Sequence, residues 1–247
     1  MLLKNKTAVI TGCNRGIGKK ILEVFSENGA NIFACSRKID NDYKLFIKEL
    51  QNKYKNEIIP IEFDFSEESQ VKESASKILL SKKPIDILVN NAGTIHTALF
   101  QMTSINKLKE VFEINFFTQT IFTQYILKSM IKNKKGNIIY ISSTSGIDGN
   151  EGRSAYSSSK AAIIAQAKAM SKEVGIHNIR VNVIAPGLIE TDMLKKNTKD
   201  EIIKEMVSNT SLKRIGQPNE IANTVLILSS DLSSFMTGQV IRVDGGM

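Results

Sequence analysis

Short runs of apolar, β-branched residues alternate with longer segments of helical period along the whole chain, and no other feature restricts its fold as strongly. The apolar runs predict seven strands, at residues 7–11, 31–36, 58–63, 85–90, 137–142, 179–184 and 239–243. Such nearly continuous apolar strands are typical of a parallel sheet whose two faces are both covered by helices. The sequence therefore predicts an α/β fold with a doubly wound, parallel, seven-stranded sheet.

The segments between the strands predict six helices, with Ser66 and Ser104 as N-caps, at residues 16–28, 41–54, 67–80, 104–132, 154–175 and 218–229. A chain of 247 residues, 42% of them hydrophobic, can bury a full core, and no repeat or linker divides it. We therefore expect a single domain over 1–247. The helical pattern weakens between about 188 and 216, where we predict a mobile, lid-like substrate segment.

Composition and spacing disfavour several classes of protein. The first residues lead into a predicted strand without an apolar leader, and nowhere do roughly 18 uncharged apolar residues follow one another, so we expect a cytoplasmic protein that contacts no membrane. The net charge of +8 is spread along the chain, which argues against nucleic-acid binding. The spacing of Cys13, Cys35, His96 and His177 predicts neither a disulfide nor a metal site.

A glycine-rich loop joins the first predicted strand to the first predicted helix. A tight turn needs glycine where φ is positive, and a pyrophosphate can bind bare backbone N–H groups at the positive end of a helix. An ordinary turn is the alternative, but the position of this loop in an alternating α/β chain favours a Rossmann-type dinucleotide site. We predict cofactor contacts at Gly12, Asn14, Arg15, Gly16, Ile17 and Gly18.

The end of the second predicted strand indicates which dinucleotide binds. An acidic side chain there would hold the ribose 2′-hydroxyl and repel a 2′-phosphate, but the strand ends in Ser36 and Arg37, with no acid before Asp40. Only six of the 33 basic residues are arginine, so Arg15 and Arg37 near one predicted site are informative. We predict NADP(H) as the cofactor; the alternative is that both arginines are solvated surface charges.

Tyr156 and Lys160 form a candidate catalytic pair, because residues four apart on a helix share one face. The pKa of a tyrosine is ordinarily about 10, so it needs a nearby positive charge to act in proton transfer near neutrality. Ser143 lies at the carboxyl end of the fifth predicted strand, where a parallel sheet forms its ligand crevice. The neighbouring Ser142 and Ser145 remain alternatives to Ser143.

The order and spacing of these motifs resemble the short-chain dehydrogenase/reductase family over essentially the whole chain. The resemblance rests on Thr11-Gly12-x-x-x-Gly16-x-Gly18, Asn90-Asn91-Ala92-Gly93, Tyr156-x-x-x-Lys160, Pro186-Gly187 and Val243-Asp244-Gly245-Gly246. Within the family the chain looks most like the 3-oxoacyl-(acyl carrier protein) reductase branch, through Ile189-Glu190-Thr191-Asp192-Met193 and Arg214-Ile215-Gly216.

The resemblance implies a role for each candidate residue. Tyr156 would protonate the carbonyl oxygen, Ser143 would bond the same oxygen, and Lys160 would also hold the nicotinamide ribose. Asn115 would order a water relay, although a buried structural amide is an equal alternative. Asp64 would meet the adenine or merely cap a helix, and Thr191 would bind cofactor or act as an N-cap. The further implied cofactor contacts are Ser36, Asn91, Ala92, Gly93, Pro186, Gly187 and Ile189.

The implied function is NADPH-dependent reduction of a ketone to a secondary alcohol, with a 3-oxoacyl thioester on acyl carrier protein as the leading substrate. His177 and Arg153 depart from the pattern of carrier-using relatives, and Arg153 suggests an anionic group near the reacting carbon. A sugar or other small anionic keto compound is therefore the alternative substrate, and a non-catalytic NADP-binding protein is a third possibility. The helices over 104–132 and 154–175 are too apolar for helices with one solvated side, and in the family they pair across a dimer, so the resemblance implies a homotetramer, a dimer of dimers. The alternative is that both helices are buried deeper in the monomer.

Overall fold

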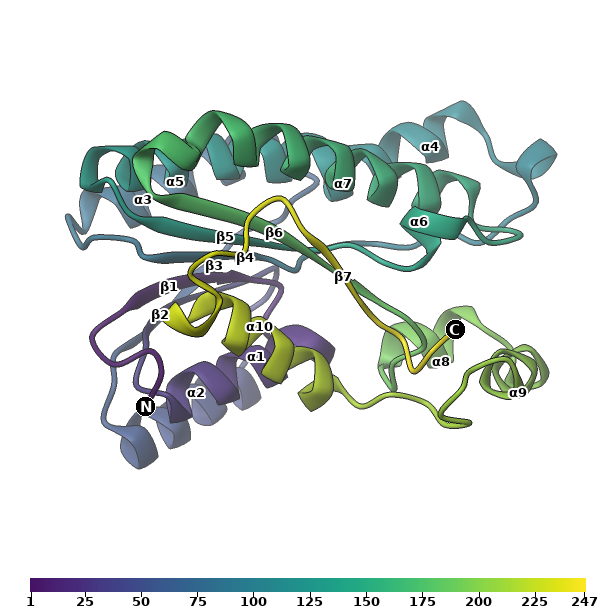
Figure 1. The fold of residues 1–247 in the computed structure, drawn as a ribbon, viewed down its shortest axis with the longest axis horizontal. Coiled ribbons are helices and arrows are strands. Elements are labelled where there is room, and N and C mark those ends of the chain that lie inside the picture. Colours follow the sequence, from purple (N-terminus) through teal and green to yellow (C-terminus); the bar gives the residue numbers. More distant parts are fainter.

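The computed structural model describes residues 1–247 and confirms the predicted α/β architecture. Seven parallel strands form one sheet in the order β3-β2-β1-β4-β5-β6-β7 (Figure 1). Their bounds are β1 Thr7–Thr11, β2 Asn31–Ser36, β3 Ile58–Glu62, β4 Ile87–Asn90, β5 Gly136–Ile141, β6 Ile179–Pro186 and β7 Val240–Val243. The chain leaves β1 toward β2 and returns to pair β4 on the other side of β1, so the sheet has its topological switch point between β1 and β4.

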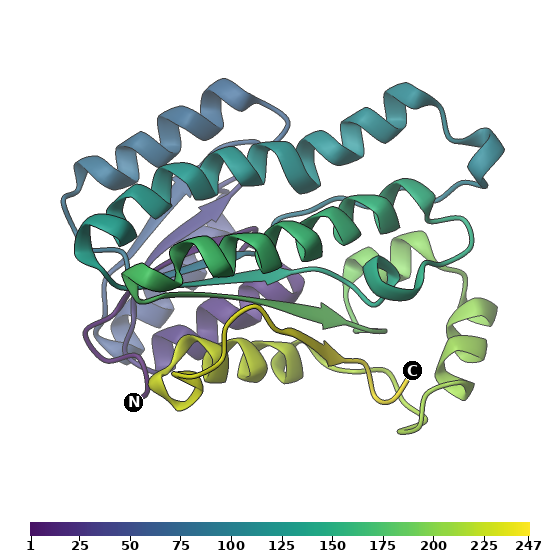
Figure 2. The same cartoon turned by 45° about the horizontal axis from the view of Figure 1, so that its top comes forward.

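Helices cover both faces of the sheet. On one face α1 (Gly16–Glu27), α2 (Asn41–Tyr54) and α10 (Pro218–Ser229) pack over a core cluster of 24 buried residues. On the other, α3 (Glu68–Leu80), α4 (Ile105–Phe112) with α5 (Thr118–Asn133), and α7 (Ser154–Val174) lie side by side (Figure 2), over a second cluster of 22 residues. No helix is long and apolar enough to span a bilayer.

Shorter elements gather near the carboxyl ends of the strands. There α6 (Ser145–Asp148) follows β5, and α8 (Asp192–Asn197) and α9 (Asp200–Ser208) stand beyond the sheet (Figure 1). Three 3-10 turns, η1 (Phe100–Met102), η3 (Gly175–His177) and η4 (Asp231–Ser233), complete the chain. The predicted lid-like segment thus contains two short helices that its weak hydrophobic pattern did not reveal.

Several predicted details differ from the structure. The helix predicted over 104–132 is interrupted by a π-helical turn, η2 (Glu113–Phe117), which separates α4 from α5. Ser104 is confirmed as an N-cap, since its side chain accepts from the backbone N–H of Lys107. The prediction for Ser66 is wrong, because α3 begins after Glu67 and the Ser66 N–H instead donates to Asp64 Oδ1 at 2.9 Å.

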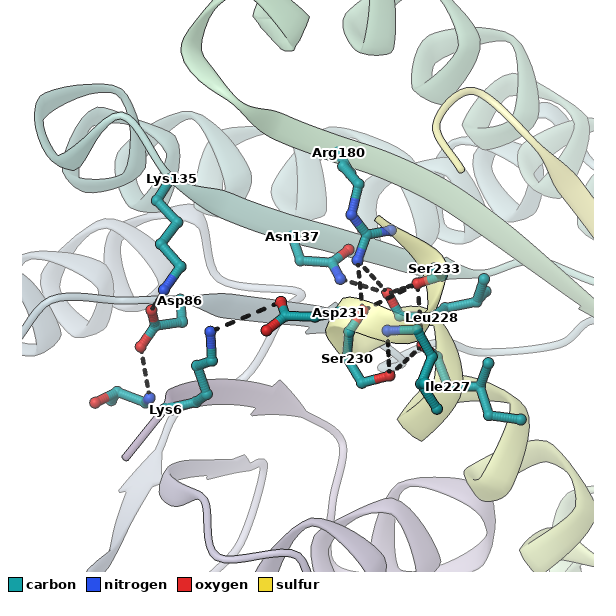
Figure 3. A network of polar contacts seen from close by, with 12 residues as sticks. Lys6, Asp86, Lys135, Asn137, Arg180, Ile227, Leu228, Ser230, Asp231 and Ser233 are labelled. Carbon is teal, nitrogen blue, oxygen red and sulfur yellow. Dashed lines mark hydrogen bonds and ion pairs between the residues drawn. The ribbon is translucent and has the colours of Figure 1, made fainter. Parts of the chain in front are cut away.

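Charged residues connect the amino ends of the central strands (Figure 3). Asp86, just before β4, accepts from the backbone N–H of Thr7 at 2.9 Å and pairs with Lys135 at 3.5 Å. Lys6 lies 4.0 Å from Asp231, the first residue of η4, which follows α10. This network fastens β1, β4, β5 and α10 at the edge of the sheet opposite the switch-point crevice.

Arg180 on β6 caps the carboxyl end of α10 with its guanidinium (Figure 3). It donates to the carbonyl oxygens of Leu228 at 2.7 Å, Ser230 at 3.1 Å and Met236 at 3.1 Å. Carbonyls at the end of a helix have no partner within the helix, and the helix dipole favours a cation there. The contact therefore stabilises the junction of α10, η4 and the sheet.

We predict that Arg180→Met lowers the free energy of unfolding by about 3 kcal/mol, because it leaves three partly buried carbonyls without their charged donor. Urea unfolding measures the change. The matched control is Arg214→Met, which removes exposed contacts with Glu220 and the Ile215 carbonyl and should lower stability much less than Arg180→Met. Equal losses in both variants would contradict this account of the cap.

Candidate active site

A cleft of about 1640 Å³ runs along the carboxyl ends of β1, β2, β4, β5 and β6, at the switch point of the sheet. With one exception, every residue predicted to bind cofactor or to act in catalysis lines this cleft. The exception is Asn115, which is fully buried behind the wall. Residues distant in sequence therefore meet in one place, as expected for an α/β sheet that binds its ligand at its carboxyl edge.

The glycine-rich loop is shaped by positions where no side chain fits. Gly12 and Gly16 have φ values of 69° and 53°, in the region that favours glycine. A Cβ on Gly12 would lie 2.9 Å from the Cα of Ala92, and a Cβ on Gly18 would overlap the carbonyl oxygen of Gly12. The loop consequently brings bare backbone against the amino end of α1, an arrangement that suits a pyrophosphate.

Two residues at the switch point hold this loop in place. The Thr11 hydroxyl accepts from the backbone N–H groups of Asn91 and Ala92, both at 3.0 Å. The Asn91 side-chain amide donates to the carbonyl oxygens of Thr11 at 2.9 Å and Gly12 at 3.1 Å. Asn91 therefore holds the glycine loop through two backbone carbonyls, and it also lines the cleft, where a cofactor contact was predicted.

Basic and hydroxyl groups gather at the end of β2. Arg37 is 73% exposed, and its Nε lies 4.0 Å from the Asp64 carboxylate. Arg15, Ser36 and Lys38 line the same end of the cleft. Asp40, the first acidic residue after β2, is the N-cap of α2. Its Oδ1 accepts a hydrogen bond from the backbone N–H of Tyr43 at 2.9 Å. The end of β2 therefore carries no carboxylate that would repel a phosphate, and basic groups are available there to bind one.

Tyr156 and Lys160 lie one turn apart on α7, whose amino-terminal half passes the carboxyl end of β5. The Lys160 ammonium is 5.8 Å from the centre of the Tyr156 ring and donates to the Ile141 carbonyl at 2.9 Å. Gly146 in α6 allows this approach, since a Cβ there would lie 2.8 Å from Lys160 Cβ. The close packing of α6 on α7 brings the end of β5 to the tyrosine.

The ionisation of both residues is perturbed by burial. Lys160 is only 4% exposed, and desolvation lowers its pKa from 10.5 to about 8. Burial raises the pKa of the Tyr156 phenol, and the Ser143 hydroxyl and the positive charge of Arg153 oppose that rise. Burial therefore moves the two pKa values apart, since it favours the neutral form of each group, and the Ser143 hydroxyl and the Arg153 charge partly offset this effect on the phenol.

We predict that Lys160→Met raises the free energy of unfolding by about 2 kcal/mol at pH 7 while abolishing activity. Below pH 8 the folded protein buries a charge that the unfolded chain keeps in water, so removing that charge is favourable. Above pH 8 the folded protein sheds this proton more readily than the unfolded chain, so the gain should shrink as pH approaches 10.5. Urea unfolding at several pH values tests this; destabilisation at pH 7 would assign Lys160 a structural role.

The structure separates the three neighbouring serines. Ser142 is buried, and its hydroxyl donates to the Lys160 carbonyl at 2.9 Å, so it serves the packing of α7. Ser143 Oγ accepts from the Ser145 N–H at 3.1 Å and interacts with the Tyr156 phenol. Of the three hydroxyls, that of Ser143 is therefore the one that lowers the pKa of the Tyr156 phenol.

Asn115 lies in the π-helical turn and binds the loop after β4. Its Oδ1 accepts from Thr94 N–H at 2.8 Å, and its Nδ2 donates to Thr94 O at 2.9 Å and Ser159 Oγ at 3.0 Å. Gly93 separates it from Lys160, since a Cβ there would be 3.2 Å from Asn115 Oδ1 and 3.4 Å from Lys160 Nζ. These contacts fit the alternative of a buried structural amide; the predicted water relay stays a prediction.

The segment after β6 forms the opposite wall of the cleft. The Gly187 N–H donates to Val243 O at 3.0 Å, and Ile189 pairs with Gly216 in an isolated bridge. Thr191 is the N-cap of α8, accepting from Leu194 N–H at 3.3 Å, as the alternative interpretation of this residue proposed. Its methyl group also faces Gly16, so this segment closes over the glycine loop.

Sequence reasoning overlooked most of the wall around Tyr156. The loop after β4 and the α6–α7 connection both line the cleft, through Thr94, Ile95, Thr97, Ala98, Leu99, Asn150, Glu151 and Gly152. None belongs to a motif with its own chemistry, so only the fold reveals them. Arg153 was singled out for a substrate anion, but its guanidinium binds Thr97, Asn197 and Thr198 of the protein.

Several known proteins are similar to this chain in sequence and in fold. Residues 12–247 match the model of a family described as enoyl-(acyl carrier protein) reductase. A 3-oxoacyl-(acyl-carrier-protein) reductase of Chlamydia trachomatis serovar D is 40% identical, with 100% of this chain and 98% of the relative covered. A 7α-hydroxysteroid dehydrogenase complexed with NADH and 7-oxo glycochenodeoxycholic acid superposes with a TM-score of 0.92 at 34% identity, covering 99% of this chain and 94% of that one.

A putative NAD(P)-dependent gluconate 5-dehydrogenase from Beutenbergia cavernae, with bound NADP at low occupancy, also has a TM-score of 0.92. It is 27% identical, with coverage of 98% and 96%. The match to the family model and the full-length identity to the chlamydial reductase agree with the glycine spacing and the Tyr156–Lys160 pair. The chain belongs to the short-chain dehydrogenase/reductase family of oxidoreductases.

Proposed function

We propose that this enzyme reduces the ketone of a 3-oxoacyl thioester, carried on acyl carrier protein, to a secondary alcohol with NADPH. The observation that carries the proposal is the meeting of Ser143, Tyr156 and Lys160 in one cleft with the glycine loop. A dinucleotide-binding protein without catalysis would not need all three. The substrate follows the chlamydial relative, whose name specifies 3-oxoacyl-(acyl-carrier-protein) reduction.

The residues of the chain supply proton transfer and charge stabilisation. Tyr156 donates its phenolic proton to the ketone oxygen, and Ser143 donates a hydrogen bond to the same oxygen, so negative charge develops where donors are already fixed. Lys160 keeps a positive charge near the phenolate that remains. A nicotinamide dinucleotide bound on the glycine loop would supply the hydride.

The residues present fit such a dinucleotide. A Cβ on Gly12 or Gly18 would strike Ala92, Asn91 or the Gly12 carbonyl, so glycine at both positions lets the loop pack closely on the amino end of α1, whose backbone N–H groups can bind a pyrophosphate. At the end of β2, Arg37, Arg15 and Ser36 offer charge and hydrogen bonds to a 2′-phosphate. These groups support NADPH as the preferred form of the cofactor.

We predict that Arg37→Asp raises the KM for NADPH by about 10- to 100-fold, because it replaces a phosphate donor with a repelling carboxylate. The KM for NADH should fall or remain unchanged, since a carboxylate at this position can accept from the ribose 2′-hydroxyl. Initial rates with both cofactors provide the measurement. Equal increases for NADPH and NADH would mean that Arg37 acts on the fold rather than on the 2′-phosphate.

The second candidate substrate is a sugar or another small anionic keto compound, which the likeness to the gluconate 5-dehydrogenase favours. A direct comparison would follow NADPH absorbance with acetoacetyl-acyl carrier protein, a short acetoacetyl thioester and 5-ketogluconate. The proposal expects the highest kcat/KM for the carrier-linked substrate. Activity on the sugar ketone with none on either thioester would replace it with the second candidate.

We also propose the cytoplasmic homotetramer that the resemblance implies. Apolar groups on the outer surfaces of the helix pair support it: Phe117 is 49% exposed and Ile131 is 37% exposed. Alanines of α7, including Ala161, Ala165 and Ala169, are exposed as well. Light scattering should give four times the 27.4 kDa of one chain, and a monomer at micromolar concentration would refute this assembly.

A further inference from the structure

Arg153 joins three segments of the chain at the mouth of the cleft. It is the last residue before α7, three positions ahead of Tyr156. Its guanidinium donates to Thr97 Oγ1 in the loop after β4, to Asn197 O at 2.8 Å and to Thr198 Oγ1 at 3.0 Å. The last two acceptors belong to residues 192–209, hereafter called the lid, which comprises α8, α9 and the residues that join and follow them.

Arg153 makes the side-chain hydrogen bonds that connect the lid to the part of the chain on the other side of the cleft. The other side-chain hydrogen bonds and ion pairs of the lid stay within residues 189–213, as with Lys195 to Glu190 and Lys213 to Ser208. Its backbone hydrogen bonds also remain local. The guanidinium binds the carbonyl of Asn197, the last residue of α8, and a cation is favoured at that end of a helix. Residues of both α8 and α9 line the cleft that this contact closes.

The same guanidinium acts on the proton donor. The positive charge of Arg153 lowers the pKa of the Tyr156 phenol and so opposes the effect of burial. Tyr156 also has Lys160 one turn along α7. The other charged residues that line this cleft near α7 come from the α6–α7 connection and the lid: Glu151, Asp192, Lys195, Lys196, Lys199, Asp200, Glu201 and Glu205.

We propose that Arg153 is a positioning residue with two roles: its guanidinium clasps the lid to α7 through Asn197 and Thr198, and its charge, three positions ahead of Tyr156 at the start of the same helix, acts on the phenol whether or not the clasp is closed. Lid closure and the acidity of the proton donor are then set by one side chain. This goes beyond the proposed ketone reduction, and its catalytic half rests on that function. The part of the proposal that concerns the lid does not depend on that function, because it involves only contacts within the chain.

Three variants separate the two halves. Thr198→Val removes a lid acceptor and keeps the charge, Arg153→Lys keeps the charge but loses the planar fork of donors, and Arg153→Gln loses both. Lid opening is read by endoproteinase Lys-C, because Lys195, Lys196 and Lys199 of the lid are exposed. Phenol acidity is read from the pH dependence of alcohol oxidation with NADP and 3-hydroxybutyryl thioester, for which Tyr156 must be deprotonated.

We expect all three variants to be cleaved in the lid several-fold faster than the parent, and to raise the ketone KM by about tenfold. Only Arg153→Gln should move the midpoint of the oxidation profile upward, by about one pH unit. Parental cleavage rates in all three variants would overturn the clasp. An unmoved midpoint in Arg153→Gln would overturn the coupling to Tyr156. Absence of oxidoreductase activity in the parent would refute the proposed function, while the cleavage rates would still test the clasp.

Discussion

Replacing Tyr156 with phenylalanine is expected to lower kcat/KM for ketone reduction by about 10³- to 10⁴-fold, while the affinity for NADPH changes little. The substitution removes only the phenolic hydroxyl, which lies beside Ser143 and is the group positioned to protonate the ketone oxygen. The Ser143 hydroxyl remains as a hydrogen-bond donor, but it is a far weaker acid than a phenol, and Ser142 is bonded to the Lys160 carbonyl. Steady-state rates together with NADPH fluorescence titration separate the loss of chemistry from any loss of binding.

Tyr140→Phe provides the matched control. It also removes one buried phenolic hydroxyl, which donates to Thr123 Oγ1 at 3.2 Å in the core beneath α5 and does not line the cleft. It should lower stability by about 1 kcal/mol and leave kcat/KM nearly unchanged. If Tyr156→Phe turned over as fast as Tyr140→Phe, the assignment of the proton donor would be wrong.

Gly18→Ala is expected to raise the Kd for NADPH by about 100-fold and to lower the free energy of unfolding by about 1–3 kcal/mol. In an open helical position, alanine would instead stabilise by about 1 kcal/mol, because it has the higher helix propensity. Here the new methyl group would overlap the carbonyl of Gly12 and the side-chain amide of Asn91. The glycine loop and the start of α1 would have to move apart, and the backbone cradle for the pyrophosphate would be lost.

Gly175→Ala is the corresponding glycine control. Gly175 follows α7 with a negative φ of −57°, and a Cβ there would meet nothing within 4 Å. We expect unchanged NADPH binding and equal or higher stability. Urea unfolding and NADPH fluorescence should be measured on both variants, and tight binding by Gly18→Ala would show that the glycine loop does not cradle the cofactor.

The sheet could be predicted because its strands are nearly continuous apolar runs. The five central strands, β1, β2, β4, β5 and β6, are almost wholly buried, whereas the edge strands β3 and β7 are only partly buried. Strand ends were less certain: β4 begins at Ile87 rather than 85, and β6 extends to Pro186 rather than 184. The break between α4 and α5 had no local signal. It coincides with the contacts of Asn115 to Thr94 and Ser159, which lie far along the chain and come together only in the fold.

The candidate site followed from residues whose chemistry is tied to spacing, such as Tyr156 and Lys160 one helical turn apart. Where several residues of one type were adjacent, as with Ser142, Ser143 and Ser145, only the structure showed which hydroxyl faces the phenol. The role of Arg153 could not be foreseen either. A guanidinium predicts an anion or a carbonyl equally well, and its partners lie in a lid whose helices are too short to leave a hydrophobic pattern.

The most direct test of the central claim follows the transferred hydrogen itself. A single turnover with NADPH carrying deuterium at the reactive C4 position, and acetoacetyl-acyl carrier protein as substrate, would be analysed by mass spectrometry of the released acyl group. The account predicts one deuterium on the carbinol carbon of the 3-hydroxyacyl product, from one of the two C4-labelled isomers and not the other. Product without deuterium from either isomer, or no product while NADPH is bound, would contradict it.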